Sequence, residues 1–241
     1  MKGALRSETL THGRVALALH SLKRDPGPEL LVLHALQGSS ADWHETALAW
    51  PGSVSALDFS GHGESDWLPG RGYCPEVYVA EADMAIARLE SAGSLYLAGA
   101  GIGAYVALLL AGARADRVSA SLLLPGAGFH GGGALPGEVA DEAQRHWQDE
   151  ISAPPRIPGS TWPDPLVRRC SRDVRPADYV EEFARAAGPL LIGAVGEEPG
   201  WLGVAQQHGR TQPAGADPRQ ALRALAQVGQ RADPTPLGAL L

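Results

Sequence analysis

The sequence predicts an α/β protein with a mostly parallel central sheet flanked by helices. Short apolar segments alternate along the chain with amphipathic stretches of ten or more residues, which is typical of strands joined by helices. One unit is almost unbroken: the apolar segment 95–98 is followed by a glycine turn at 99–103, a nearly all-apolar helix over 104–111 and a second apolar segment over 118–124. The chain also holds 30 glycines and 19 prolines, which fits the many turns of such a fold.

The other expected elements follow from the same patterns. They are strands over 15–22, 30–36, 54–59 and 189–195, and helices over 42–50, 75–92, 199–207 and 218–230. A turn-forming stretch joins the first two strands, so we expect them to form an antiparallel pair. Asp217 and Pro218 suit the cap and first position of the last helix.

Residues 125–188 break this rhythm. A glycine run at 131–133 and a polar helix around 138–150 come first, and five prolines follow between positions 154 and 165. We interpret this stretch as a small lid insertion, because a long irregular segment inside a compact domain is commonly a functional loop. The expectation is therefore a single domain over 1–241.

Composition excludes several classes of function. With 20 Lys and Arg against 27 Asp and Glu, the net charge is −7, so a nucleic-acid partner is not expected. Cys74 and Cys170 stand alone, and no His or Cys pair has metal-ligand spacing, so we expect no disulfide framework and no metal. Without a membrane span or a signal-peptide core, the chain is expected in the cytoplasm. The glycine turn lacks the dinucleotide-binding spacing, so no cofactor is expected.

Three stretches taken together resemble the α/β-hydrolase fold. Residues 34–39 read HALQGS, which resembles the family's His-Gly-x-x-Gly-Ser loop after the third strand, with Ala35 in place of glycine. Residues 58–65 read DFSGHGES, which matches the family's Asp-x-x-Gly-His-Gly-x-Ser loop after the fourth strand. The glycine turn at 99–103 stands where the family has its nucleophile elbow, G-x-S-x-G. The resemblance implies this fold from about residue 9 to 230.

The elbow departs from the family pattern, because its central residue is Gly101 and carries no nucleophile. Glycine adopts the strained positive-φ conformation of an elbow at little cost, so the turn can persist without the reaction. The missing side chain is expected to leave a space at the floor of the pocket. A family related to the N-myc downstream-regulated proteins also has a glycine-rich elbow and is regarded as non-hydrolytic; the similarity is to the elbow alone.

The other two members of the catalytic triad are also in doubt. The family's acid follows the seventh strand, where Glu197 is a candidate and a solvated charge pair with Glu198 is the alternative. The family's histidine precedes the last helix, where this sequence has Ala216. His208 lies close after Glu197 and is read either as a displaced base or as a cation at a helix end.

Several remaining groups could still bind a ligand or move a proton. The resemblance implies an oxyanion hole from the backbone N–H groups of Leu36 and Ile102. His34 and His62 are candidate acid/base residues, although in this family such histidines also hold loops together. Asp58 is a further candidate, as a loop organiser or base, and Ser39, Ser40 and Cys74 are candidate displaced nucleophiles. Five tryptophans either line a pocket under the lid or only hold the lid on the core: Trp43, Trp67, Trp147, Trp162 and Trp201.

Three functions therefore remain open from the sequence. The first is a pseudo-hydrolase, expected to come from a bacterium, that binds a small apolar acid, ester or peptide, or a protein partner, and catalyses no reaction. The second is a non-hydrolytic enzyme, such as an epimerase, cyclase or lyase, that uses His34, His62, Glu197 or the substrate's own carboxylate. The third is a residual esterase with a displaced nucleophile.

Overall fold

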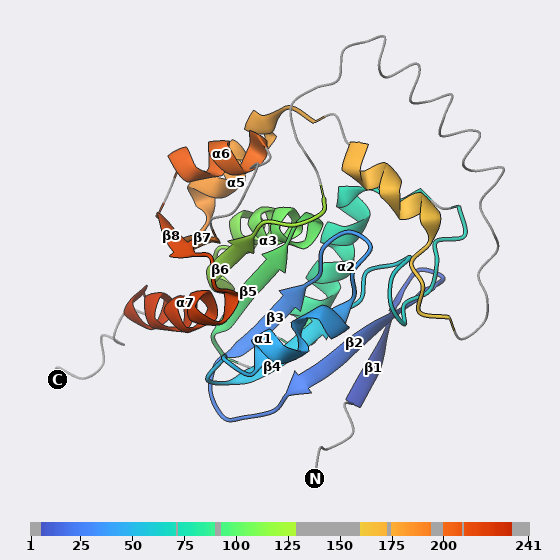
Figure 1. Ribbon diagram of the computed structural model, residues 1–241, viewed down its shortest axis with the longest axis horizontal. Helices are drawn as coiled ribbons and strands as arrows, with labels where there is room; N and C mark the ends of the chain where they lie inside the picture. Colours follow the sequence, from blue (N-terminus) through green and yellow to red (C-terminus); the bar gives the residue numbers. More distant parts are fainter. Residues whose placement is uncertain are drawn as a thin grey trace.

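The structure is a computed structural model that describes residues 6–70, 72–89, 93–128, 160–172, 175–193, 200–208 and 210–232 (Figure 1). The strands are β1 (Arg6–His12), β2 (Val15–Lys23), β3 (Glu29–Leu33), β4 (Ser53–Leu57), β5 (Leu95–Ala100), β6 (Val118–Leu124), β7 (Leu190–Gly193) and β8 (Thr211–Gly215). The α-helices are α1 (His44–Ala47), α2 (Pro75–Arg88), α3 (Ile102–Ala113), α5 (Glu181–Ala186), α6 (Gly200–Gln207) and α7 (Pro218–Ala232), and the 3-10 helices are η1 (Ser40–Trp43), η3 (Pro165–Arg172) and η4 (Ala177–Val180).

All eight strands belong to one sheet with the order β1-β2-β4-β3-β5-β6-β7-β8. The pairs β1–β2 and β2–β4 are antiparallel, and every pair from β4–β3 to β7–β8 is parallel. The mostly parallel sheet is therefore confirmed. The parallel strands β3 to β8 have their carboxyl ends at one edge, where open sheets of this kind bind ligands.

One predicted pairing was wrong. The segments 15–22 and 30–36 do form strands, but β2 lies between β1 and β4, whereas β3 lies between β4 and β5. The missing partner of β2 is β1, which the sequence analysis did not predict. Its residues are mostly polar because it is an edge strand, and a two-residue turn at Gly13 and Arg14 joins it to β2.

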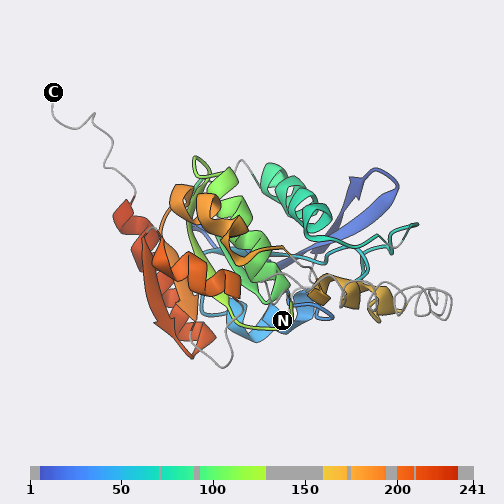
Figure 2. The same ribbon diagram turned by 90° about the horizontal axis from the view of Figure 1, so that it is seen from above.

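Helices cover both faces of the sheet, as Figure 2 shows. The larger core packs α2, α3 and α6 on one face, and α3 is buried along most of its length because its sequence is apolar on every side. The smaller core packs η1, α1 and α7 on the other face, with Trp43, Trp50 and Leu222 among its members.

The expected lid is only partly described. The polar helix around 138–150 lies outside the described residues, as does Trp147. Within 125–188, the segment just before η3 contacts the loop between β4 and α2. Asp164 N–H donates to Gly61 O at 2.8 Å, and the Tyr73 hydroxyl donates to Asp164 Oδ2 at 2.9 Å. In the part of the chain that the structure describes, no helix combines the length and apolar character needed to cross a membrane.

Candidate functional site

The glycine turn between β5 and α3 has the geometry of an elbow. Gly101 has φ 54° and ψ −117°, a backbone conformation that residues other than glycine rarely adopt. The flanking glycines allow close backbone contacts: a Cβ on Gly99 would lie 2.1 Å from Gly103 O, and one on Gly103 would lie 2.4 Å from Leu33 O. The sequence therefore forms the tight strand-turn-helix of the elbow, but the elbow carries no attacking group.

The two N–H groups expected to form an oxyanion hole do converge on one point. Leu36 N–H and Ile102 N–H both donate to the same atom, Ala127 O, at 2.9 and 3.0 Å. Two backbone donors aimed at one carbonyl oxygen are the arrangement that stabilises an oxyanion in acyl-transfer enzymes. Here the oxygen is supplied by the chain itself, from the segment directly after β6.

Residues 126–128, called the strap below, fill the space above the elbow. A Cβ on Gly101 would lie 2.0 Å from Ala127 O, and a Cβ on Gly128 would lie 2.3 Å from Ile102 N. Both contacts are far shorter than side-chain carbons allow, so glycine is required at both positions. The expectation of an open space at Gly101 was wrong, because the carbonyl of Ala127 occupies it.

His34 and His62 are held by backbone groups at both ring nitrogens. The Nε2 of His34 accepts from Phe59 N–H at 3.1 Å, and its Nδ1 donates to Ala35 O at 2.8 Å. The Nε2 of His62 accepts from Gln37 N–H at 3.1 Å, and its Nδ1 donates to Ser60 O at 3.1 Å. Both side chains are fully buried, and their ring centroids lie 4.7 Å apart.

This burial keeps both histidines neutral. Desolvation lowers the pKa of His34, and desolvation together with the neighbouring His34 lowers the pKa of His62 to about 3. A ring whose two nitrogens are occupied and whose charged form is disfavoured has no free site for a substrate proton. The geometry therefore favours the loop-holding interpretation over acid/base catalysis.

Asp58 organises the same loops. Its Oδ1 accepts from Ser40 N–H at 2.7 Å, and its Oδ2 accepts from Glu64 N–H at 2.8 Å and lies 3.0 Å from His20 Nε2. Burial alone would raise the pKa of Asp58, but the hydrogen bonds from His20 and from the two backbone N–H groups lower it to about 2. The hydrogen bond to Asp58 in turn raises the pKa of His20. Asp58 is thus a buried carboxylate fully engaged in structure.

A second buried carboxylate lies behind these loops. Glu81 of α2 accepts from Ser60 N–H at 2.9 Å through Oε2 and is fully buried. Desolvation raises the pKa of Glu81 to about 7. The sequence analysis did not single out this residue, because on a helix its spacing is that of an ordinary polar position.

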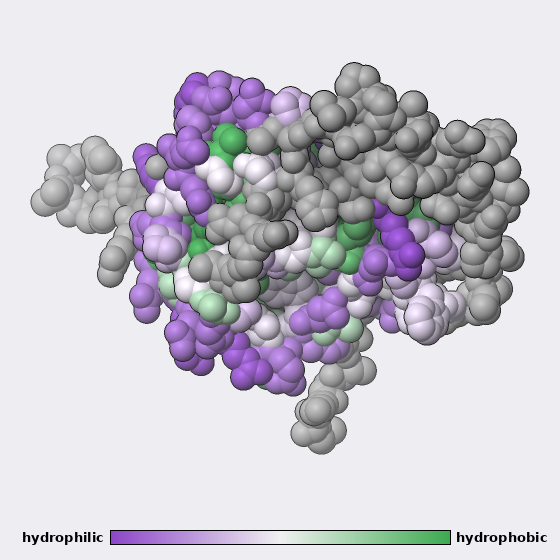
Figure 3. Space-filling view, turned by 45° about the horizontal axis from the view of Figure 1, so that its top comes forward, coloured by the Kyte–Doolittle hydropathy of each residue, from purple (hydrophilic) through white to green (hydrophobic). Residues whose placement is uncertain are grey.

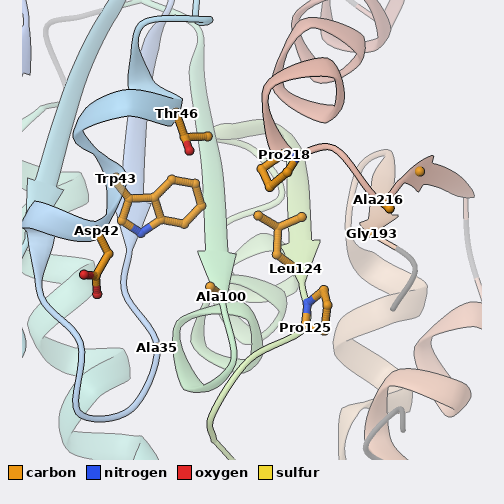
Figure 4. A pocket seen from close by; sticks show the side chains of 11 residues that line it. Ala35, Asp42, Trp43, Thr46, Ala100, Leu124, Pro125, Gly193, Ala216 and Pro218 are labelled. Carbon is orange, nitrogen blue, oxygen red and sulfur yellow. The ribbon is translucent and has the colours of Figure 1, made fainter. Parts of the chain in front are cut away.

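A cavity of about 280 Å³ opens on the other side of the elbow, at the carboxyl ends of β5, β6, β7 and β8 (Figure 4). The residues that line it are Ala35, Asp42, Trp43, Thr46, Ala100, Leu124, Pro125, Gly193, Gly215, Ala216 and Pro218. Figure 4 shows the Trp43 ring pointing into the space toward Leu124, with Thr46 on the same side as Trp43 and Pro218 on the opposite side. The lining is mostly small or apolar, with Asp42 and Thr46 as its polar side chains.

The predicted pocket residues are divided by the structure. Trp43 lines the cavity, whereas Asp58, Gly101 and Trp67 are not among its lining residues. Asp58 is excluded because its carboxylate is enclosed by the loops that it holds, and Gly101 because the strap covers it. Among the other tryptophans, Trp162 is exposed and Trp201 packs against Tyr105. Among the described tryptophans, Trp43 is the one that lines the cavity.

Among the described residues, the remaining catalytic candidates form no hydrogen-bonded nucleophile-base pair at the elbow. His208 directly follows α6, and its Nε2 lies 3.6 Å from Glu181 Oε1. Glu197 lies outside the described residues. Ser40 is buried beside Asp58, and burial raises the pKa of the Cys74 thiol, which opposes thiolate formation.

Sequence reasoning missed Ala127, whose carbonyl fills the oxyanion hole. A signal was present, because residues 126–128 read GAG directly after a predicted strand that neighbours the elbow strand. Two glycines separated by one small residue at that edge indicate a close backbone approach. Asp42 and Thr46 were also missed as lining residues, since each lies on a short polar helix of ordinary composition.

The sheet order, the elbow and the helices on both faces together define the α/β-hydrolase fold, as the motifs predicted. Comparison with solved structures agrees. The chain is similar to the thioesterase domain from the curacin biosynthetic pathway, with a TM-score of 0.70, 17% sequence identity, and coverage of 95% of this chain and 99% of that one. It is also similar to a hypothetical protein from Pseudomonas aeruginosa PAO1, with a TM-score of 0.67, 18% identity, and coverage of 92% and 97%.

A third similar structure is the bottromycin epimerase BotH in complex with bottromycin A2, with a TM-score of 0.56, 17% identity, and coverage of 94% of this chain and 97% of that one. The sequence matches no protein-family model and, at a significant level, no curated protein sequence. At these identities the similarity shows the fold alone.

Proposed function

We propose that this protein is a non-hydrolytic member of the α/β-hydrolase fold that binds a small apolar ligand in the cavity beside Trp43. The observation that carries the proposal is the bond of both oxyanion-hole donors, Leu36 N–H and Ile102 N–H, to the chain's own Ala127 O. A substrate carbonyl cannot use donors that the protein already satisfies. The elbow below them has no nucleophile, so the two devices that hydrolysis needs are both absent from this arrangement.

The cavity supports binding as the retained activity. Its volume of about 280 Å³ is near the lower end of the range for small-molecule sites, and its lining is predominantly apolar. In the view of Figure 3, hydrophilic residues gather along the outer rim of the described surface, while apolar and weakly polar ones lie nearer its middle. An apolar molecule of about ten non-hydrogen atoms would gain binding free energy by leaving water for this space.

A second candidate is an enzyme that uses the cavity without a triad, as in epimerisation or elimination. The similarity in fold to the epimerase BotH favours it. Among the lining residues only Asp42 is titratable, so either Asp42 or the substrate itself would have to move the proton. A protein partner remains an alternative to the small ligand, and a cytoplasmic location remains a prediction from the sequence.

Hydrolysis is tested with p-nitrophenyl acetate and p-nitrophenyl butyrate. We expect release of nitrophenol at the rate of buffer alone, and the same rate from a Ser39→Ala, Ser40→Ala, Cys74→Ala triple variant. Turnover by the wild type that this triple variant loses would overturn the proposal. Restoration through Gly101→Ser with Ala216→His is expected to fail, because the new Cβ at position 101 would meet Ala127 O.

Binding is tested by isothermal titration and ligand-observed NMR with 2-phenylethanol as the probe. We expect a Kd on the order of 1 mM, in line with the binding energy that so small a ligand can gain. Ala216→Leu should abolish binding by filling the cavity, whereas Ala41→Leu, a change at an exposed residue outside the lining, should leave it intact. Absence of binding to the wild type, or equal binding to the two variants, would contradict the proposed site.

A further inference from the structure

The lining of the cavity has a marked chemical bias. Of its eleven residues, Asp42 carries a negative charge, Thr46 a hydroxyl and Trp43 an indole N–H, and none is lysine, arginine or histidine. The nearest described arginine on α7, Arg219, pairs with Glu45 at 3.1 Å and is exposed. An anionic ligand would therefore enter an apolar space without a counterion, which costs free energy.

Three backbone N–H groups near the cavity have acceptors within the protein. The hole N–H groups of Leu36 and Ile102 donate to Ala127 O. At the start of α7, Pro218 has no N–H, and Arg219 N–H donates to Asp217 Oδ1 at 2.9 Å. A helix N-terminus normally attracts anions through free N–H donors, and at the start of α7 the missing N–H of Pro218 and the bond of Arg219 N–H to Asp217 reduce their number.

Acceptors, in contrast, remain available. Within the described residues, Asp42 accepts a hydrogen bond at Oδ2, from Ser39 N–H at 3.0 Å, which leaves Oδ1 for a ligand. Its neighbour Trp43 points its indole ring into the space (Figure 4). A carboxylate beside an aromatic ring suits an ammonium group, because the first attracts its charge and the second binds cations through its π face.

We infer that the cavity selects a small apolar amine in its ammonium form over the corresponding acid. The inference rests on the proposed function, since it names the ligand class of that same site. It also narrows the expectation from the sequence, which included apolar acids on the premise of an open oxyanion hole. The ammonium group lies at Asp42 and the apolar part lies against Trp43 and Leu124.

The test compares three probes of similar size by isothermal titration at pH 7: 2-phenylethylamine, 2-phenylethanol and 3-phenylpropionate. We expect the amine to bind about three- to tenfold more tightly than the alcohol, as an exposed ion pair with a cation–π contact allows, and the acid to bind most weakly. Asp42→Asn should bring the amine down to the affinity of the alcohol. Glu45→Gln removes a nearby exposed charge outside the lining and should leave the preference unchanged.

A second measurement does not depend on any variant. Raising NaCl from 0.05 to 0.5 M should reduce the amine's advantage over the alcohol in the wild type, since salt screens an exposed charge pair. Equal binding of amine and alcohol, tightest binding of the acid, or a preference that survives Asp42→Asn would overturn the inference while leaving the proposed function standing. Failure of all three probes to bind would overturn both.

Discussion

The two sides of the Gly101 elbow differ in how their polar groups are used. On one side, His34, His62 and Asp58 have their side-chain polar atoms committed to hydrogen bonds between the loops after β3 and β4. On the other side, the cavity at the ends of β5 to β8 has an apolar lining with one carboxylate at its mouth. The comparison teaches that polar residues of family motifs can be fully used in holding loops together, while the cavity lies on the side with few polar side chains.

The largest expected effect comes from breaking the polar side. Asp58→Ala leaves two backbone N–H groups and His20 without their acceptor, so we expect a loss of about 3–5 kcal/mol in the free energy of unfolding, measured by urea denaturation. The matched change Asp83→Ala removes an ion pair with Arg114 that is partly exposed, and should cost about 1 kcal/mol or less. A similar loss in both variants would contradict the organising role of Asp58.

The strap that separates the two sides gives the next effect. Gly101→Ala and Gly13→Ala both place an alanine at positive φ, at 54° and 63°, but only the first brings a Cβ into contact with the strap. We expect a cost of about 1 kcal/mol at Gly13 and about 2–4 kcal/mol at Gly101, measured by thermal and urea denaturation. Equal costs at the two positions would show that the carbonyl of Ala127 does not fill the elbow.

The buried titratable groups of the polar side predict a pH dependence. His62 has a folded pKa of about 3 against an ordinary 6.5, so the unfolded chain binds its proton first and stability rises with pH between these values. Glu81 has a folded pKa of about 7 against an ordinary 4.5, so stability falls with pH between those values. Each group changes the free energy of unfolding by at most about 1.4 kcal/mol per pH unit.

The two contributions are separated by urea denaturation from pH 4.5 to 6.5. His62→Asn should lower the slope of stability against pH, and Glu81→Gln should raise it. His44→Asn, at an exposed position on α1, serves as the control and should leave the slope unchanged. A slope that is the same in all three variants would mean that these groups are not buried as described.

The smallest effect on stability is expected on the cavity side. Ala216→Leu lies at an exposed position, so it should change the free energy of unfolding by no more than about 0.5 kcal/mol while it blocks the cavity. Denaturation and titration of the same preparation measure both quantities. A loss of several kcal/mol would show that this side is packed like the other, and the comparison would then fail.

Most elements could be predicted from the sequence because their signals are local. The strand over 118–124 and the start of the last helix at Pro218 coincide with β6 and α7. The helix predicted over 42–50 is instead two consecutive four-residue helices, η1 and α1. The edge strand β1 escaped prediction, because a strand with one buried residue in Leu10 has no apolar pattern to detect.

The sequence by itself determined the fold class, the elbow without a nucleophile and the absence of a histidine at position 216. These follow from residue identity at positions that motifs define. Only the tertiary structure decided that Ala127 O accepts hydrogen bonds from Leu36 N–H and Ile102 N–H. It also decided that the ring nitrogens of His34 and His62 are hydrogen-bonded to backbone groups, and that Asp42 and Trp43 line one cavity. The physical reason is that hydrogen bonds and cavities depend on distances between segments far apart in the chain, which no local pattern contains.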